Sequence, residues 1–377
     1  MKISSGSWID VYLNVGEIDM QKKHVYFLIN SLEGGGAERV VTNFANIAIK
    51  EGKEVYIITL KSISFYDLPK GVHHIPLSNI KNNFLMFLLI PRYVWKFRNI
   101  LRKYHLFEGM SLLEIANFVH ILAKKRSTIS FRTHISVFKG VFGLLQRVMI
   151  KILYPRAGTI VVNSLENKYD LAEYLHVPEE KIIVIYNPID KERIEKMKSE
   201  EISEELKNKI QGKRVLITTG RLVGKKGFGN KNHNKIILAL KTVYDTVDKN
   251  RIYLIIGDGP ERPSLEKLVH SLGLQDNIVF LGMQKNIFKY LNVADVFLYA
   301  SEVEGFPNVL IEAKEVGLPI ITSDFKSGAK EVILGEYTKD IGKNVHYPYQ
   351  GKYGTLLDLN DYQDQFLETY KKMFISC

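Results

Sequence analysis

Apolar residues follow two alternating patterns along the chain. Short apolar runs rich in β-branched and aromatic residues are typical of buried strands, and in the longer segments between them apolar residues recur every three or four positions, as in helices. Because helices link consecutive strands in this order, the strands of each sheet are expected to run parallel. The runs predict strands at residues 24–30, 55–60, 128–131, 159–163 and 182–186, and again at 215–219, 253–256, 278–281, 296–299 and 319–322.

The order of these elements predicts two α/β domains. A strand, the loop Gly34-Gly35-Gly36, a helix at 37–50 and the strand at 55–60 form one βαβ unit, and a second series begins after a charged, weakly apolar stretch. A chain of 377 residues is too long for one ordinary core and suits two doubly wound parallel-sheet domains. The expected boundaries are an extra N-terminal segment at 1–19 with Met20 as an alternative start, domains at 20–190 and 214–357, a linker at 191–213 and a helical tail at 358–377.

Composition is that of a soluble globular protein. Apolar residues make up 46% of the chain and charged residues 25%, which excludes wholesale disorder. The single cysteine, Cys377, permits no disulfide within the chain, and this fits a reducing compartment. The longest apolar run, at 84–90, is far shorter than the ~20 residues that a membrane span needs. We therefore expect a cytoplasmic protein that does not cross a bilayer.

Positive charge is concentrated in one segment of the first domain. Residues 81–160 contain 14 of the 52 lysines and arginines but 2 of the 41 acidic residues, so the rest of the chain is nearly neutral. Apolar and aromatic side chains beside basic ones suit the surface of an anionic membrane. A core helix with a solvated basic face is the alternative, and nucleic-acid binding is not favoured because no zinc spacing or RNA-binding motif accompanies the charge. After the apolar run at 84–90, Tyr93, Trp95 and Phe97 are interleaved with Arg92, Lys96, Arg98, Arg102 and Lys103.

Two glutamates flank a predicted helix start in the second domain. Glu304 follows the predicted strand at 296–299, and Glu312 lies inside the helix that begins near Pro307, a residue suited to a first helical turn. Ligands of parallel α/β sheets bind at the carboxyl ends of the strands, and a helix start offers free backbone N–H groups to an anion. Carboxylates at these two positions can accept hydrogen bonds from sugar or ribose hydroxyls. Solvated glutamates of an ordinary helix are the alternative.

Two other strand ends of this domain carry groups that suit a diphosphate. Gly220-Arg221 follows the strand at 215–219 directly and precedes a turn that contains Lys225, Lys226 and Lys231. Arginine offers a planar fork of donors and lysine a point charge, and both bind phosphate oxygens. The next strand ends at Gly257-Asp258-Gly259-Pro260, where the glycines either let the backbone approach a ligand or form a plain turn.

Taken together, these segments resemble the retaining glycosyltransferases of family 4, which have the GT-B fold. The resemblance covers about residues 23–357 and is greatest to bacterial enzymes that build capsule, O-antigen or lipid-linked oligosaccharides. It implies two Rossmann-like domains facing across a cleft, with the nucleotide sugar on the second domain and the acceptor on the first. The matching segments lie at 32–40, 220–222, 257–260, 280–282 and 304–313.

The resemblance also implies roles for individual residues. Arg221 and a nearby lysine would hold the donor's diphosphate, Glu312 would bind the ribose, and Glu304 would bind the transferred sugar. Family members bind the nucleotide without a metal, so no metal or other cofactor is expected. His134, just after the strand at 128–131, matches a histidine near the acceptor, with a structural histidine as the alternative. Further donor contacts are expected from Gly220, Gly257, Gly259, Gly305, Phe306, Pro307, Asn308 and Val309, and contacts with the diphosphate across the cleft from Gly34, Gly35 and Gly36.

The lysine of the phosphate clamp has two candidates. Counting forward from Arg221 selects Lys226, whereas counting back from the helix at 236–240 selects Lys231. We favour Lys231, because the register of the following helix fixes which side chain reaches the phosphates. The family pattern also includes a strand at 104–113, which Glu108-Gly109 interrupts, and His73 and His74 are expected in a loop.

The expected activity is the transfer, with retention, of a hexose or N-acetylhexosamine from a nucleotide diphosphate sugar to a polyprenyl-linked glycan, with uridine as the favoured nucleotide. Such an enzyme would lie at the inner face of the plasma membrane and would bind no nucleic acid. Two alternatives stay open. One is a non-hydrolysing sugar-nucleotide epimerase, which also has two α/β domains but needs no membrane face, and the other is a non-catalytic member of the fold.

Overall fold

The chain divides into two compact units, residues 1–188 and 189–377, and each is described on its own. The structure is a computed structural model. Several sequence-based expectations concern residues outside its described ranges, namely 1–19, Gly34, Gly35, Lys226 and Cys377. The described ranges are 24–33, 36–62, 68–80, 82–134, 138–187, 189–224, 230–247, 249–335 and 345–375.

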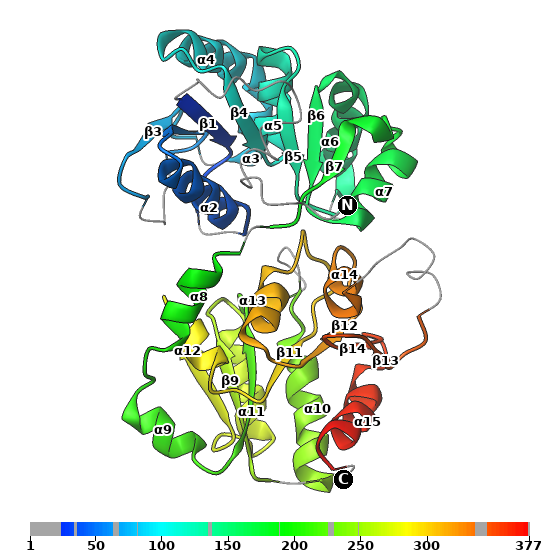
Figure 1. Ribbon diagram of the computed structural model, residues 1–377. Helices are drawn as coiled ribbons and strands as arrows, with labels where there is room; N and C mark the ends of the chain where they lie inside the picture. Colours follow the sequence, from blue (N-terminus) through cyan, green and yellow to red (C-terminus); the bar gives the residue numbers. More distant parts are fainter. Residues whose placement is uncertain are drawn as a thin grey trace. The chain divides into compact units, whose positions relative to one another are not determined.

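The described part of unit 1 contains a seven-stranded parallel sheet in the order β3-β2-β1-β4-β5-β6-β7 (Figure 1). Side chains of β1 point alternately to opposite faces and are buried on both, so the strand reads as a continuous apolar run. The strands are β1 (His24–Ile29), β2 (Glu54–Thr59), β3 (Val72–Pro76), β4 (Glu108–Leu112), β5 (Thr128–Phe131), β6 (Thr159–Val162) and β7 (Ile182–Val184).

Helices cover both faces of this sheet. One core joins α2 to the strands, and the other joins α3, α4, α5 and α6 to the opposite face. The helices are α2 (Gly36–Lys50), α3 (Asn83–Leu88), α4 (Ile90–Lys103), α5 (Glu114–Ala123), α6 (Gly140–Leu153) and α7 (Leu165–Leu175), with short 3-10 turns η2 (Tyr154–Arg156) and η3 (Glu179–Lys181).

Two local expectations for unit 1 were wrong. Glu108-Gly109 does not interrupt the strand, because β4 begins at Glu108 and a side chain at Gly109 would meet the Tyr26 carbonyl oxygen at 2.2 Å. Glycine therefore lets β4 lie directly against β1. His73 and His74 lie in β3 rather than in a loop, where His74 Nε2 is 2.9 Å from the Thr59 hydroxyl. A strand with this polar sequence forms at the sheet edge because its neighbour β2 supplies the hydrogen bonds.

The described part of unit 2 has a second seven-stranded sheet, in the order β10-β9-β8-β11-β12-β14-β13. All pairs are parallel except the edge pair β13–β14. The strands are β8 (Arg214–Thr219), β9 (Arg251–Ile256), β10 (Ile278–Gly282), β11 (Val296–Tyr299), β12 (Ile320–Ser323), β13 (Tyr349–Gln350) and β14 (Gly354–Leu357). The prediction of two doubly wound α/β domains is confirmed.

Two layers of helices enclose the sheet of unit 2. Helices α10 (His233–Thr246), α11 (Arg262–Ser271) and α15 (Tyr362–Phe374) share one core, in which Phe366 and Tyr370 of the expected tail are buried. The other core includes side chains of α8 (Lys191–Lys198), α9 (Glu204–Ile210), α12 (Phe288–Leu291), α13 (Asn308–Val316) and α14 (Ala329–Leu334). Residues 191–213, expected to form a linker, instead belong to this unit, because Ile194, Ile202 and Leu206 are buried in its core and Met197 and Ile210 pack against that core.

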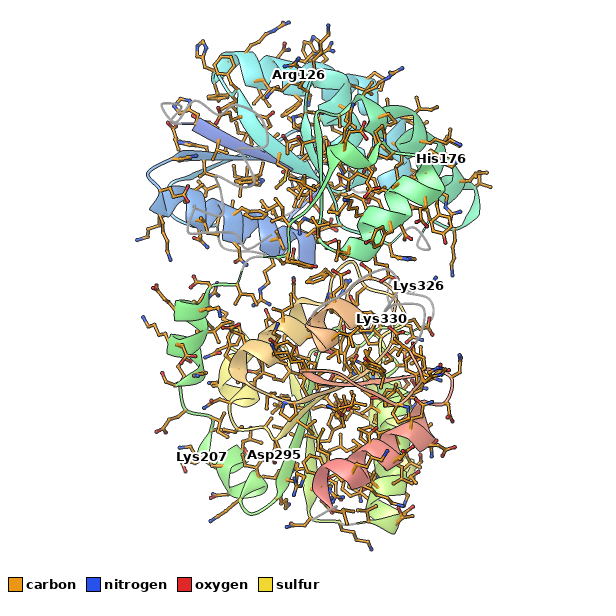
Figure 2. All side chains as sticks on the ribbon, turned by 45° about the vertical axis from the view of Figure 1, so that its right-hand side comes forward. Arg126, His176, Lys207, Asp295, Lys326 and Lys330 are labelled. Carbon is orange, nitrogen blue, oxygen red and sulfur yellow. The ribbon has the colours of Figure 1, made fainter. Side chains whose placement is uncertain are left out.

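The parallel strands of the unit 2 sheet start at one end of the unit and finish at the other, and labelled residues mark the two ends. Lys326 and Lys330 follow β12 and lie at one end of the unit, whereas Asp295 precedes β11 and lies at the other end (Figure 2). At the Asp295 end, the carboxylate accepts a hydrogen bond from the Val215 amide at 2.7 Å. The Lys326 end is the carboxyl edge, where parallel sheets bind ligands. Within the described residues, no helix is both long and apolar enough to span a membrane.

Candidate functional site

The Glu304 carboxylate lies just beyond β11 and is held by three side chains. Its Oε1 accepts hydrogen bonds from the Tyr299 hydroxyl at 2.6 Å and from Ser301 Oγ at 2.8 Å, and it forms an ion pair with Lys231 Nζ. The lysine and glutamate side chains are 12% and 16% exposed. Burial, and secondarily the nearby carboxylate, raise the pKa of Tyr299, which therefore stays protonated and donates. The sequence did not identify Tyr299 or Ser301, although both lie within five residues of Glu304.

Lys231 reaches Glu304 because the residue after it adopts a special conformation. Asn232 has left-handed backbone angles, φ 45° and ψ 39°, and precedes α10. Its side-chain amide donates to the Ala300 carbonyl at 2.8 Å, which ties the lysine to the end of β11. The ammonium also lies 5.4 Å from the centre of the Tyr299 ring. Thus the structure brings Lys231 to Glu304, and Lys226 lies outside the described residues.

His233, the first residue of α10, is a buried neighbour of this lysine that the sequence did not single out. It is 4% exposed. Burial, together with the positive charge of Lys231, lowers its pKa to about 4, so the imidazole is neutral at pH 7. A cationic residue beside Lys231 would compete with it for Glu304, whereas a neutral one does not.

The loops after β8 and β9 pack backbone against backbone. The amide of Gly220 donates to Ile256 and the amide of Leu222 to Asp258, both at 3.0 Å. Gly257 has φ +133°, and a side chain there would lie 1.9 Å from the Gly220 carbonyl oxygen. Its glycine is therefore required by the neighbouring loop, which the sequence left undecided between a turn and a ligand contact. Gly259 is constrained in the same way, with the Leu222 carbonyl oxygen 2.4 Å from an added Cβ.

Arg221 belongs to the loop after β8, between Gly220 and Leu222, and is exposed. The preceding residue, Gly220, lies close to two side chains that contact Glu304, because a Cβ added at Gly220 would be 3.9 Å from Tyr299 and 4.0 Å from Lys231. A guanidinium and an ammonium are therefore carried by the same edge of one sheet, on segments that the backbone hydrogen bonds fix. Both groups suit the oxygens of a diphosphate.

The segment 305–309 leads from Glu304 into α13. The helix begins at Asn308 without a side-chain cap, and the amides of Asn308 and Leu310 donate to the carbonyls of Phe306 and Pro307, both at 3.0 Å. Within α13, Glu312 is 7% exposed. The sequence missed the loop that supports this segment: Ser327 Oγ donates to the Gly305 carbonyl at 2.6 Å. Gly328, with φ +96°, lies so close that an added Cβ would be 2.5 Å from the Phe306 ring.

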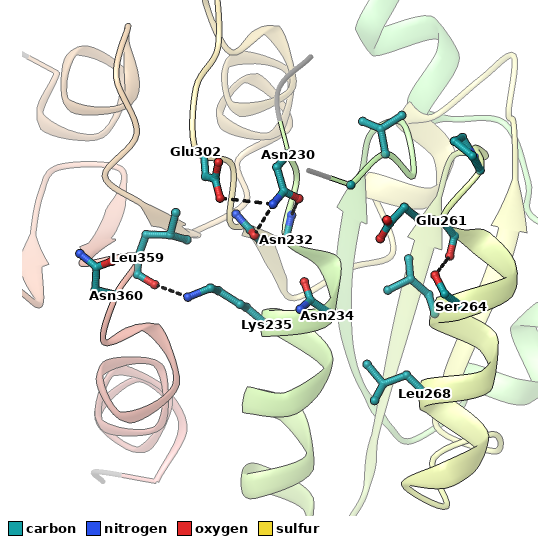
Figure 3. A pocket seen from close by; sticks show the side chains of 14 residues that line it. Asn230, Asn232, Asn234, Lys235, Glu261, Ser264, Leu268, Glu302, Leu359 and Asn360 are labelled. Atoms are coloured by element: carbon teal, nitrogen blue, oxygen red, sulfur yellow. Dashed lines mark hydrogen bonds between the residues drawn. The ribbon is translucent and has the colours of Figure 1, made fainter. Parts of the chain in front are cut away.

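A hollow of about 1020 Å³ lies beside residues 230–235, which we call the lysine segment because it contains Lys231 (Figure 3). Amides and carboxylates line much of it, and Asn230 Nδ2 donates to Asn232 Oδ1 at 2.9 Å and to Glu302 Oε1 at 3.2 Å. The backbone amide of Glu302 also donates a hydrogen bond to the Asn230 carbonyl at 3.0 Å. These contacts tie the lysine segment to the loop after β11, as Figure 3 shows for the side chains. In α10, Lys235 Nζ donates to the Leu359 carbonyl at 2.8 Å.

In unit 1, His134 follows β5 and is buried against α7. Its Nε2 lies 2.9 Å from Asp170 Oδ2, and the two side chains are 4% and 11% exposed. An aspartate at this position fixes the orientation of the imidazole ring. The sequence gave no signal for Asp170, because the pair is 36 positions apart and joins two different elements. Gly36, the described residue of the glycine-rich loop, begins α2 at the same sheet edge.

Glu114 is a second acidic group that sequence reasoning missed at the carboxyl edge of unit 1. It begins α5 directly after β4, whose neighbours in the sheet are β1 and β5. Burial raises the pKa of this carboxyl to about 7. Nearby strand ends supply Lys61, whose ammonium is 3.3 Å from Glu33, and Arg132, which bonds Asn187. The edge therefore offers polar groups of both signs to a ligand.

Comparison with known proteins identifies the family. Residues 34–193 match the model described as Glycosyltransferase Family 4, and residues 199–344 match Glycosyl transferases group 1. Over 323 residues, the chain is 32% identical to the N-acetylgalactosamine-N,N'-diacetylbacillosaminyl-diphospho-undecaprenol 4-alpha-N-acetylgalactosaminyltransferase of Campylobacter jejuni, a match that covers 83% of each protein.

Solved structures agree on the fold. A glycosyltransferase from Rickettsia africae superposes with a TM-score of 0.71 at 19% identity and covers 94% of this chain and 88% of its own. HepE from Anabaena, solved in complex with UDP, gives 0.66 at 16% identity and covers 94% and 91%. At these identities the likeness concerns the fold alone, and it confirms the expected GT-B architecture. The chain thus belongs to the bacterial family 4 glycosyltransferases and is a glycosyltransferase enzyme.

Proposed function

We infer that the protein moves a hexose or N-acetylhexosamine from a uridine diphosphate sugar to a polyprenyl-diphosphate-linked glycan in cell-surface polysaccharide synthesis, with retention at the anomeric carbon. The observation that carries this inference is the cluster of Glu304, Lys231 and Tyr299 at the carboxyl edge of unit 2, beside the uncapped start of α13. The Campylobacter relative is named for transfer to a diphospho-undecaprenol-linked sugar, and HepE was solved with UDP. Both names support the proposed substrates.

The donor would be held by groups that follow two strands of unit 2, β8 and β11. Arg221 and Lys231 neutralise the diphosphate, and the backbone of residues 306–309 supports the sugar and phosphate. Glu312 accepts hydrogen bonds from the ribose. Glu304 accepts from hydroxyls of the transferred sugar, and the Lys231 ammonium, which has three donors, can bond the diphosphate and the carboxylate together.

The reaction balances without a protein base. The bond between the anomeric carbon and the leaving phosphate oxygen breaks, and the acceptor oxygen forms the new bond on the same face. The proton of the acceptor hydroxyl passes to the leaving phosphate oxygen, whose charge Arg221 and Lys231 stabilise as it develops. His134, oriented by Asp170, would donate to a hydroxyl near the transfer point, and Asp170 is a positioning residue. No metal is required in this scheme.

The acceptor is proposed to lie at an anionic membrane, at the inner face of the plasma membrane. Residues 81–160 carry 14 basic and 2 acidic residues, which gives this part of unit 1 a strong positive charge. Such a charge attracts anionic headgroups. It would raise the local concentration of an enzyme whose acceptor is embedded in the bilayer.

A panel of nucleotide sugars tests the donor assignment. A bound donor at 100 times its Kd should stabilise the purified protein by about 2.7 kcal/mol, and a uridine diphosphate hexose or N-acetylhexosamine should raise its melting temperature. At the same donor concentration, Glu312→Ala should lose about half of this stabilisation, as expected for tenfold weaker binding, whereas Glu266→Ala, which replaces an exposed glutamate on α11, should retain all of it. Transfer to a polyprenyl-diphosphate glycan, followed by mass spectrometry and NMR of the new linkage, tests acceptor class and retention.

Two results would refute the proposal. Interconversion of the nucleotide sugar without transfer would indicate an epimerase. Failure of every nucleotide sugar to stabilise the protein or to be consumed would indicate a non-catalytic member of the fold.

A further inference from the structure

Helix α6 exposes an apolar stripe along one side. Val141, Leu144, Leu145, Val148 and Ile152 are 88%, 61%, 40%, 45% and 52% exposed. Their spacing of three or four residues puts them on one face of the helix. The opposite face is buried in unit 1 through Gly143, Ile150 and Leu153. A soluble helix normally reverses this arrangement, with polar residues outward.

The apolar surface continues from α6 onto α3. The ring of Phe142 packs edge to face on Phe84 and Phe87, with centroid distances of 6.2 and 5.6 Å. On α3, Phe84, Leu85 and Leu88 are 56%, 43% and 58% exposed. Eight large apolar side chains are therefore exposed on two contacting helices. We refer to these residues of α3 and α6 as the apolar face.

Charge around this face has one sign. Neither α3 nor α6 contains an acidic residue. Basic residues accompany the stripe on α6: Lys139 precedes the helix, Arg147 lies within it, and Lys151 lies in its last turn. Lys139 and Lys151 are exposed. An apolar stripe with flanking lysines is complementary to the headgroup region of an anionic bilayer, where acyl chains and negative charge lie within a few ångströms.

The sequence favoured both the apolar run at 84–90, which includes most of α3, and the basic residues of α4 for membrane contact, but α4 is used differently. Its apolar side is buried, with Tyr93 and Phe97 in the core. Lys96 donates to the Leu77 carbonyl, and Arg98 donates to the carbonyls of Ala123 and Leu122 at 3.1 and 2.6 Å. Two of its basic side chains thus bind other parts of unit 1.

We propose that the apolar face of α3 and α6 inserts into the headgroup region of an anionic bilayer, with Lys139 and Lys151 on its phosphates. This inference rests on the proposed function, in which the acceptor is membrane-linked, and it moves the membrane contact from α4 to α6. The apolar face determines which side of unit 1 contacts the lipid. The site therefore combines an apolar contribution, which salt does not weaken, with an electrostatic one, which salt screens.

Vesicle sedimentation of the full chain tests this assignment. The variant Leu144→Gln/Val148→Gln/Ile152→Gln keeps good helix formers at exposed positions and should fold like the wild type, as circular dichroism and melting temperature would verify. It should bind vesicles of equal parts phosphatidylglycerol and phosphatidylcholine about 100-fold more weakly than the wild type. The matched control Tyr174→Gln/Leu238→Gln alters exposed apolar residues on α7 and α10 and should bind normally.

The basic residues give a second, independent readout. Lys139→Gln/Lys151→Gln should reduce the salt-sensitive part of binding, whereas Arg102→Gln/Lys103→Gln on α4 should reduce it less. Wild-type binding by the α6 triple variant would overturn the proposal. A wild-type dimer that the triple variant makes monomeric, with vesicle binding intact, would also overturn it and would assign the face to a second copy.

Activity separates this proposal from the proposed function. The triple variant should keep wild-type turnover of a water-soluble acceptor analogue and lose turnover of a polyprenyl-linked acceptor in vesicles. If the wild type transfers no sugar to any acceptor, the proposed function fails, but the vesicle result still decides the role of the apolar face.

Discussion

The ion pair between Lys231 and Glu304 allows a sharp test of the donor site. Replacing Lys231 with Met removes the cation, while the Tyr299 and Ser301 hydroxyls at 2.6 and 2.8 Å still donate to the carboxylate. Removing one partner of a fully buried pair costs about 3–5 kcal/mol. Because the carboxylate keeps two donors and the pair is 12% and 16% exposed, we expect a smaller loss, about 2 kcal/mol.

A double-mutant cycle isolates the pair. Lys231→Met and Glu304→Gln should each lower the stability of unit 2, and the double variant should lose about 1–2 kcal/mol less than their sum. For a unit of 189 residues, each kcal/mol corresponds to about 2–4 °C in melting temperature, so each single variant should melt about 4–8 °C lower. Differential scanning calorimetry without ligand measures this directly.

The same cycle decides between the two lysines. Lys231→Met should lower kcat/KM by about 100-fold or more, as expected for the loss of one charge at a leaving group. Lys226→Met should not change the free energy of unfolding, and its effect should simply add to that of Glu304→Gln. Additive stability losses for Lys231→Met and Glu304→Gln, together with a large loss of activity for Lys226→Met, would refute the assignment. Lys241→Ala, which removes a surface pair on α10, controls for loss of charge.

Three further predictions concern the same unit. Glu312→Ala should raise the KM for the nucleotide sugar about tenfold with little change in kcat, whereas Glu304→Ala should mainly lower kcat; identical effects in steady-state kinetics would contradict their separate roles. Gly257→Ala should destabilise the protein by at least ~2 kcal/mol in denaturant unfolding, because the added Cβ meets a carbonyl oxygen at 1.9 Å. The buried His233, with its pKa lowered to about 4, favours folding fully above pH ~6.5, and this contribution should fall by up to ~1.4 kcal/mol per pH unit as the pH drops toward 4. His233→Gln should flatten the dependence of stability on pH, whereas replacement of the exposed His270 with Gln should not. Equal stability–pH profiles for the two variants would show that His233 is not the source of this dependence.

The strands were the most predictable part of the molecule. Strands β5 and β11 begin and end at the predicted residues. Strand β11 is apolar and buried along its whole length, as expected of a parallel strand with helices on both faces. Strand β3 was missed, since its polar sequence at the sheet edge has no uninterrupted apolar run. The supposed linker at 191–213 was misjudged for a related reason: five apolar residues are enough to attach two short helices when a larger unit supplies the rest of the core.

Within the candidate site, the sequence located single residues better than their partners. Glu304 and Glu312 were found because a strand, a turn and a helix start follow one another locally. Asp170 was not, because nothing near His134 in the chain indicates which residue of α7 lies 2.9 Å from its ring. The purpose of Gly257 was equally hidden, since the carbonyl oxygen that excludes a side chain belongs to a loop 37 positions earlier.

The sequence by itself determined the two α/β units, the strand ends that carry the residues of the proposed donor site and the concentration of positive charge in residues 81–160. These follow from local periodicity and composition, which are properties of consecutive residues. Only the tertiary structure decided that Lys231 pairs with Glu304, and that α4 buries its apolar side while α6 exposes one. Periodicity shows that a helix has an apolar face, but whether another element covers that face depends on contacts between residues far apart in the chain.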